Sequence, residues 1–122
     1  MQLIGKQAQL IEALVNELSI TSSRIINIHI YTNNDLLQID IELEFIYKKG
    51  HNRGVLKFID VQEYGFCYTS DRHFYNVEIF KFFKLEEDFY ISFDPVDESE
   101  TIHNEDQDFI KARQVEGFLI IE

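Results

Sequence analysis

The clearest pattern in the chain is an alternation of apolar and polar residues over positions 37–47, broken only at Ile46. The apolar members are Leu37, Ile39, Ile41, Leu43, Phe45 and Tyr47, and Gln38, Asp40, Glu42 and Glu44 stand between them. Successive side chains of a strand point to opposite faces, so this pattern predicts a long strand with one dry and one wet face. One-sided strands of this kind are typical of antiparallel sheets.

A second alternating segment precedes it, with Ile26, Ile28 and Ile30 at every other position. Asn33-Asn34-Asp35 lies between the two segments. Asn and Asp tolerate left-handed backbone conformations and bond their own backbone, so they favour a turn here. The two segments are therefore predicted to form a β-hairpin.

Further apolar runs separated by polar or Gly-containing segments predict more strands. These cover Val55–Val61, Tyr64–Tyr68, Asn76–Leu85, Phe89–Phe93 and Phe109–Ile121. Pro95 ends the run before it, because proline cannot donate to a ladder. We expect the last strand to bend near Gly117, since an interior glycine often marks a bulge.

The N-terminal segment has a different period. Apolar residues recur at spacings of three and four from Leu3 to Leu18, which predicts a helix, although Leu3 and Ile4 also fit a short leading strand. The chain is thus expected to form a single domain, 1–122, of the mainly β (α+β) class. It would have an N-terminal helix followed by about seven mostly antiparallel strands, forming a curved sheet, a sandwich or a partly open barrel.

The negative charge is concentrated in one segment. The formal net charge is −11, and residues 86–108 contain ten acids and no Lys or Arg, whereas the other 99 residues contain 12 acids and 11 bases. The ten acids are Glu86, Glu87, Asp88, Asp94, Asp97, Glu98, Glu100, Glu105, Asp106 and Asp108. This segment is interpreted as a solvated acidic loop or as a docking surface for a basic protein, with Tyr90 as an aromatic anchor.

A cation site is a third interpretation of the same segment. Asn104, Asp106 and Asp108 have the spacing of the first calcium ligands of an EF-hand, but Phe109 and Val115 stand where that loop needs Gly and Glu. A looser carboxylate set could still bind calcium from separate parts of the chain. Its members would be Asp94, Asp97, Glu98 and Asp106.

No catalytic or cofactor motif is present in the sequence. The histidines His29, His51, His73 and His103 have no zinc-ligand spacing. Cys67 has an aromatic setting, which predicts a buried apolar role rather than a nucleophile paired with His73 or His103. We therefore expect a protein that is not an enzyme and has no catalytic residue, resident metal or cofactor.

Composition and targeting signals limit the partners. With 22 acids against 11 bases, a nucleic-acid partner is not expected. The basic group around one loop is interpreted as a solvated turn: Lys48, Lys49, His51, Arg53 and Lys57. No signal peptide or membrane-length apolar run is present, and the lone cysteine excludes an internal disulfide framework. These features predict a cytoplasmic protein.

Aromatic residues also cluster. Eleven of the 17 Phe and Tyr residues lie between Tyr64 and Phe93, and Phe80, Phe82 and Phe83 would place large rings on both faces of one strand. If these rings fill the core, the strand needs a covering layer on each side. If some are exposed, a homodimer through this strand is the simplest outcome.

Two short segments carry a resemblance. Phe89-Tyr-Ile-Ser-Phe-Asp-Pro95, followed by Glu105-Asp-Gln-Asp-Phe-Ile-Lys-Ala112, resembles the closing part of small bacterial proteins, some of which are immunity proteins of polymorphic toxin systems. Those families have Leu at the place of Phe93 and Asn at that of Gln107. The resemblance implies a compact, non-enzymatic, cytoplasmic protein that neutralises a toxin. The leading hypothesis is thus a binding protein that docks a basic partner, and the alternatives are a homo-oligomeric subunit and a cation-binding protein.

Overall fold

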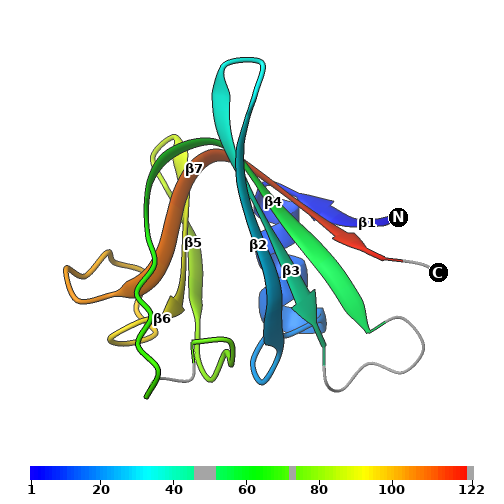
Figure 1. Ribbon diagram of the computed structural model, residues 1–122. Coiled ribbons are helices and arrows are strands. Elements are labelled where there is room, and N and C mark those ends of the chain that lie inside the picture. Colours follow the sequence, from blue (N-terminus) through cyan, green and yellow to red (C-terminus); the bar gives the residue numbers. More distant parts are fainter. Residues whose placement is uncertain (46–51, 72–73, 121–122) are drawn as a thin grey trace.

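The structure is a computed structural model that describes residues 1–45, 52–71 and 74–120 (Figure 1). Its elements are β1 (Gln2–Lys6), α1 (Ala8–Glu12), a π-helical turn (Ala13–Glu17), β2 (Arg24–Asn33), β3 (Leu36–Glu44), β4 (Arg53–Gly65), β5 (Lys81–Leu85), β6 (Asp88–Asp94) and β7 (Gln107–Leu119). The fold is mainly β, as the alternating pattern predicted.

The seven strands form one antiparallel sheet that is not closed into a barrel. The strand order is β2-β3-β4-β7-β6-β5, and β1 pairs with β7 as well. The two longest strands, β4 and β7, lie side by side and curve over the top of the molecule in Figure 1. Their curvature divides the sheet into two leaves: β1, β2 and β3 on one side, and β5 and β6 on the other.

Strand β7 changes its partner along its length. Its first half pairs with β6 and its second half with β1, while β4 runs along its other edge throughout. Gln7 lies at the change of partner. Its backbone N–H donates to the Val115 carbonyl at 2.9 Å, and its side-chain oxygen accepts the Val115 N–H at 3.0 Å. Gln7 thus satisfies the backbone of β7 where neither strand reaches it.

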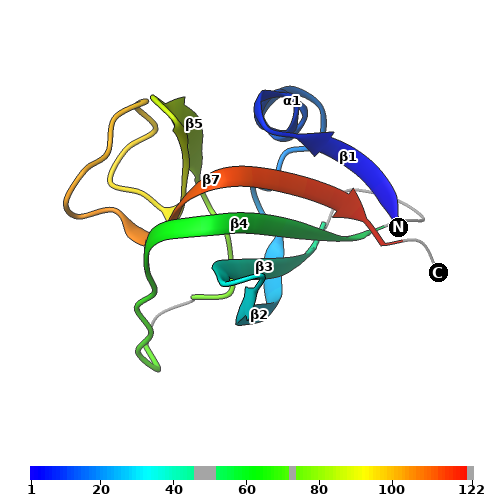
Figure 2. The same cartoon turned by 90° about the horizontal axis from the view of Figure 1, so that it is seen from above.

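The hydrophobic core lies between the two leaves and is covered by the helix, which Figure 2 shows on one side of the curved sheet. Helix α1 contributes Leu10 and the π-helical turn after it contributes Leu14, both completely buried. Leu10 lies over Gly117, where a Cβ atom would come within 2.4 Å of Leu10 Cδ1. The other core side chains come from both leaves: Ile39, Ile41, Leu43, Leu56, Phe58, Phe82, Phe89, Ile91, Phe93, Ile110, Val115 and Leu119.

The N-terminus differs from the helix predicted over 3–18. Leu3 and Ile4 belong to β1, so the leading-strand alternative is confirmed, and the helix begins only at Ala8. The cause is local. Gln7 has a positive φ of 53°, which a helix does not accommodate, and Gly5 approaches the Leu10 backbone to the point where a Cβ would lie 3.0 Å from its nitrogen.

The predicted strands 55–61 and 64–68 are one strand, β4, which ends at Gly65. The polar residues between them belong to a bulge. The register against β7 shifts between Val61 and Glu63, and Asp60 has a positive φ of 58°. A bulge bends its strand and increases the twist, and this bend allows β4 to extend across both leaves of the sheet. At Gly117, where a bend was expected, the β7 register against β4 is regular, and the irregularity lies in β1 opposite it, between Leu3 and Gly5.

The strand predicted over 76–85 is shorter, because β5 starts at Lys81 and Asn76 forms only an isolated bridge with Arg24. Phe82 faces the core and Phe83 the opposite side, and both are at least 95% buried. This chain therefore covers both faces of the aromatic strand itself, and a homodimer through that strand is not needed to bury the rings.

Other expectations concern the basic loop and Cys67. Lys48, Lys49 and His51 lie outside the described residues, whereas Arg53 and Lys57 form ion pairs with Glu42 at 2.7 Å and Asp40 at 3.2 Å. The prediction that Cys67 is buried is wrong. It follows the end of β4 in irregular chain, where its thiol is exposed.

Candidate docking surface

The outer face of the second leaf carries a small aromatic layer of its own. Cross-strand register places Phe83 opposite Tyr90, and Ser92 opposite Phe109. The ring centroids of Phe83 and Tyr90 are 5.3 Å apart, and those of Tyr90 and Phe109 are 5.9 Å apart. This face would be an exposed aromatic patch if the sheet ended there. The connection between β6 and β7, residues 95–106, folds back over it, and we call this segment the acidic loop.

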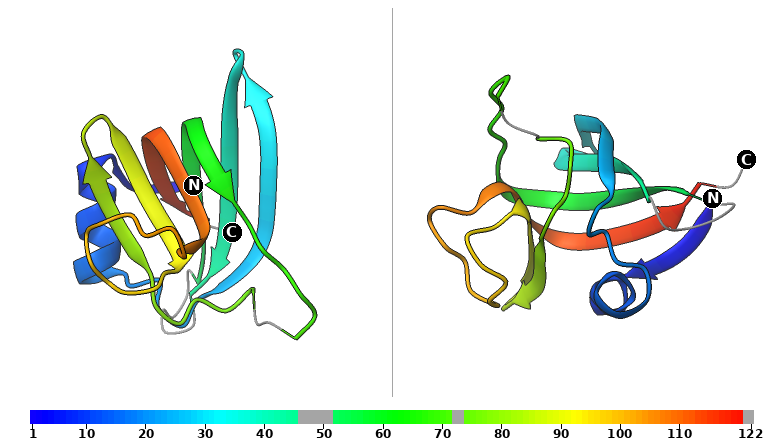
Figure 3. Two further views of the ribbon diagram at one scale, coloured as in Figure 1. Left: turned by 90° about the vertical axis from the view of Figure 1, so that its left-hand side faces the viewer. Right: turned by 90° about the horizontal axis from the view of Figure 1, so that it is seen from below.

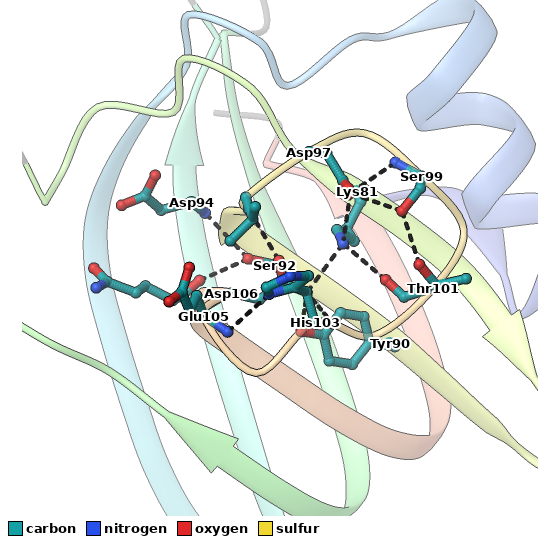
Figure 4. Close-up of polar contacts among 12 residues, drawn as sticks. Lys81, Tyr90, Ser92, Asp94, Asp97, Ser99, Thr101, His103, Glu105 and Asp106 are labelled. Atoms are coloured by element: carbon teal, nitrogen blue, oxygen red, sulfur yellow. Dashed lines mark hydrogen bonds and ion pairs between the residues drawn. The ribbon is translucent and has the colours of Figure 1, made fainter.

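A buried ion pair holds the acidic loop against the sheet (Figure 4). Lys81 Nζ on β5 lies 3.0 Å from Asp106 Oδ2, and the two side chains are 2% and 1% exposed. The same ammonium lies 3.2 Å from Asp97 Oδ1 and donates to the Thr101 carbonyl at 2.8 Å. Lys81 thus reaches three acceptors, the full number of its N–H donors, and joins the beginning, middle and end of the loop.

Both carboxylate oxygens of Asp106 accept hydrogen bonds. Its Oδ2 accepts from the Tyr90 hydroxyl at 2.8 Å and from the His103 N–H at 3.0 Å, and its Oδ1 accepts from the Val96 N–H at 3.0 Å. With Lys81, four donors therefore surround one carboxylate. A buried charge is stabilised only when it is paired and hydrogen-bonded in this way, so the cluster acts as a structural latch.

The ionisation of the cluster follows from these contacts. Burial alone would raise the pKa of Asp106, but the N–H donors of Val96 and His103, with Lys81 and Tyr90, outweigh it and lower the pKa. Burial, followed by the bond to Asp106, raises the pKa of Tyr90. Hydrogen bonds from Ser99, followed by Lys81, lower the pKa of Asp97 to about 2. At neutral pH the carboxylates are charged and the tyrosine is protonated.

The loop between these anchors is shaped by short-range bonds. Asp97 accepts from both the backbone N–H and the hydroxyl of Ser99, at 3.1 and 2.7 Å. His103 Nδ1 accepts the N–H of Glu105 at 3.1 Å. The remaining loop acids point outward. Within the described chain, the exposed side chains of Glu98, Glu100 and Glu105 make no ion pair.

The predicted docking residues fall into three groups. Asp94, Asp97, Glu98, Glu100 and Glu105 are exposed at the loop end of β6. Glu86, Glu87 and Asp88 lie at its other end, roughly 20 Å away at about 3.3 Å per residue. Arg113 pairs with Glu87 and Asp88 there, at 2.8 Å each. The acidic segment is therefore two separate clusters, not one surface.

The third group is buried, and for it the prediction of an exposed docking role is wrong. Tyr90, Asp106 and Asp108 are 2%, 6% and 2% exposed. Tyr90 and Asp106 belong to the latch. Asp108 Oδ1 accepts the Cys67 N–H at 3.0 Å and ties the start of β7 to the chain that follows β4. These buried residues support the surface from below and are not part of its exposed face.

The structure adds acids that the local charge count missed. An open hollow of about 370 Å³ beside the loop is lined by Asp71, Phe74, Asn76, Glu78, Ile79, Phe93, Asp94 and Asp108. Asp71 and Glu78 precede the acidic segment in sequence and reach Asp94 only through the fold. A hydrogen bond from Thr69 lowers the pKa of Asp71, so it is ionised at neutral pH.

The geometry does not favour a cation at the predicted carboxylate set. Two of its members, Asp97 and Asp106, already share the Lys81 ammonium. In the described ranges 1–45, 52–71 and 74–120, no group of three or more His, Cys, Asp or Glu residues has the arrangement of a metal site. None of the helices described is long and apolar enough to cross a membrane.

Comparison of the chain with protein-family models, with curated proteins and with solved structures gave no match. The resemblance of residues 89–95 and 105–112 to immunity proteins therefore stays a prediction.

Proposed function

We propose that this chain is a small non-enzymatic binding protein that docks a basic protein through the acidic loop. The observation that supports the proposal is the latch. Lys81 is bonded on the inner side of the loop, where Asp97 and Asp106 share its single positive charge. The charges of Glu98, Glu100 and Glu105 remain unpaired by any described residue and face solvent.

The physical advantage of this arrangement is preorganisation. A surface that is already ordered loses less conformational entropy on binding than a mobile acidic segment would. Clustered charge of one sign steers an oppositely charged partner and raises its association rate. A cationic toxin domain, which the resemblance to immunity proteins implies, is a partner of this kind.

The experiment compares two triple variants of equal net charge. The first, E98Q/E100Q/E105Q, neutralises the exposed acids of the loop. The control, E12Q/D35N/E63Q, neutralises three exposed acids outside it. The probe is a panel of basic proteins, including secreted nuclease domains, tested for association rate against salt concentration. We expect the loop variant to associate roughly tenfold more slowly and with a weaker salt dependence, and the control to resemble the wild type.

Two results would contradict the proposal. Equal slowing in both triple variants would mean that net charge alone, not the loop, attracts basic proteins. Binding that is independent of salt in the wild type would remove electrostatic steering altogether.

A further inference from the structure

Among the residues that the structure describes, none pairs with the outer edge of β2 over most of its length. Figure 3 shows β2 at the end of the sheet, beyond β3, in its left-hand view. In the described chain only the start of this edge is occupied: Ile25 donates to the Tyr75 carbonyl at 2.7 Å, and Arg24 bridges to Asn76. From Ile26 to Asn33 no described strand lies alongside.

The hairpin turn fixes which backbone groups face outward. Asn33 pairs with Leu36 across the two-residue turn of Asn34 and Asp35, whose φ angles of 53° and 63° are those of a type I′ turn. The closing pair, Asn33 and Leu36, exchanges both of its N–H···O=C hydrogen bonds. In an antiparallel ladder, successive residues direct their N–H and C=O groups alternately toward the partner strand and away from it. Ile28, Ile30 and Thr32 therefore direct their N–H and C=O groups away from β3.

This edge lacks the usual protection against strand pairing. Exposed edges are normally defended by charged residues, proline or bulges. The stretch Ile25–Asn34 contains no Asp, Glu, Lys, Arg or Pro, and its only bulge lies at its start, between Ile25 and Asn27. Ile30 on this strand is 40% exposed. The edge is thus uncharged and partly apolar, and its backbone donors and acceptors are open.

We propose that β2 pairs with β2 of a second copy of this chain, antiparallel and centred on Ile30. This register places Ile30 opposite its own copy and Ile28 opposite Thr32, so the outward groups of all three residues are paired. On the other face it places His29 opposite Tyr31 and Asn27 opposite Asn33. Each of these cross-strand pairs is uncharged, and the paired stretch, Asn27 to Asn33, stops short of Ile25, which the segment at Tyr75 covers.

A second copy suits this edge better than an unrelated strand. A two-fold axis requires a surface that is complementary to itself, and an antiparallel strand whose outward backbone groups at Ile28, Ile30 and Thr32 pair with those of its own copy meets that requirement. The pairing also leaves the acidic loop free, because β2 and β5 lie at opposite ends of the sheet. The dimer would therefore present two acidic loops.

The first experiment measures the mass of the intact chain by size-exclusion with light scattering between about 1 µM and 1 mM, a range that covers weak association. We expect the mass to double with concentration. I30K places a charge at the centre of the edge and should give a monomer throughout. I79K adds the same charge at an isoleucine of matched exposure, 39%, and should still dimerise. A wild type that remains monomeric, or a dimer that survives I30K, overturns the proposal.

The second experiment tests the register. In a C67S background, I30C should form a disulfide-linked dimer under mild oxidation, because directly opposite Cα atoms lie about 5.5 Å apart. I28C is the matched control, since its two copies would lie about 13 Å apart along the strands. Cross-linking at 28 as readily as at 30, or at neither position, contradicts the pairing. Higher salt should strengthen the dimer while it weakens docking to a basic partner, so the two proposals can fail independently.

Discussion

Lys81 is bonded by two aspartates that differ chiefly in burial, which allows the latch to be tested by a matched pair of variants. Asp106 Oδ2 and Asp97 Oδ1 lie 3.0 and 3.2 Å from the same Nζ, but their side chains are 1% and 52% exposed. D106N and D97N each remove one carboxylate charge with almost no change in shape. A large difference between them therefore reports the buried cluster around Asp106: its ion pair with Lys81 and its hydrogen bonds from Tyr90, Val96 and His103.

The expected magnitude follows from the surroundings of Asp106. Removing one partner of a buried pair costs about 3–5 kcal/mol, because the other charge is left without compensation. Lys81 keeps Asp97 and the Thr101 carbonyl, so we expect D106N to lose about 3 kcal/mol, the lower end of that range. For a chain of this length the melting temperature should fall by about 10 °C. D97N should lose far less, because water already solvates half of its side chain.

The assay is urea unfolding followed by circular dichroism at pH 7, with the slope of free energy against urea as a check that the unfolded state is unchanged. A loss for D106N no larger than that for D97N would refute the latch as the element that holds the loop.

Two further predictions concern acid pH and the contact between the helix and β7. Asp106 and Asp97 have pKa values lowered in the fold, to about 2 for Asp97, against about 3.9 in an unfolded chain. Their stabilisation is therefore present above the unfolded pKa and is lost as the pH falls through the lowered folded values, so the difference in melting temperature between wild type and D97N/D106N should shrink steadily from about pH 5 to about pH 2. A difference as large at pH 2 as at pH 7 would contradict this. G117A should destabilise the chain by about 1–3 kcal/mol, because the new methyl group would meet Leu10 Cδ1 at 2.4 Å. In the same unfolding assay, the double variant G117A/L10A should lose less stability than the sum of the losses of the two single variants.

The sequence predicted those parts of the fold in which one face of an element is buried and the other is exposed to solvent. The alternation over 37–47 identified β3, and Asn34 and Asp35 identified the hairpin turn, because both signals are local. The continuity of β4 was not predictable in this way. A bulge with a positive φ at Asp60 resembles a turn in sequence, and only pairing with the distant β7 shows that the strand continues.

For the candidate docking surface too, the features that depend on neighbouring residues were predicted from the sequence, and those that depend on contacts between distant residues were not. Counting charges located the acidic loop, but it treated Glu86–Asp88 and the loop as one patch, since sequence separation does not show that a strand holds them apart. Lys81 lies outside the acidic segment, and Asp106 is 25 positions later. Their contact depends on the β5–β6 pairing and on the loop folding back, neither of which a charge count contains.

The latch also explains how so acidic a segment can lie close to the sheet. Like charges repel, so the exposed acids at 97, 98, 100 and 105 favour a loop that extends into water. The donors that oppose this are buried and reach the carboxylates from the protein side: Lys81 from β5, and Tyr90 from β6. A cation placed on the outside would hold the loop equally well but would cancel its field. Because Lys81 bonds the loop from below, the loop keeps both its order and its outward charge, the combination that electrostatic docking requires.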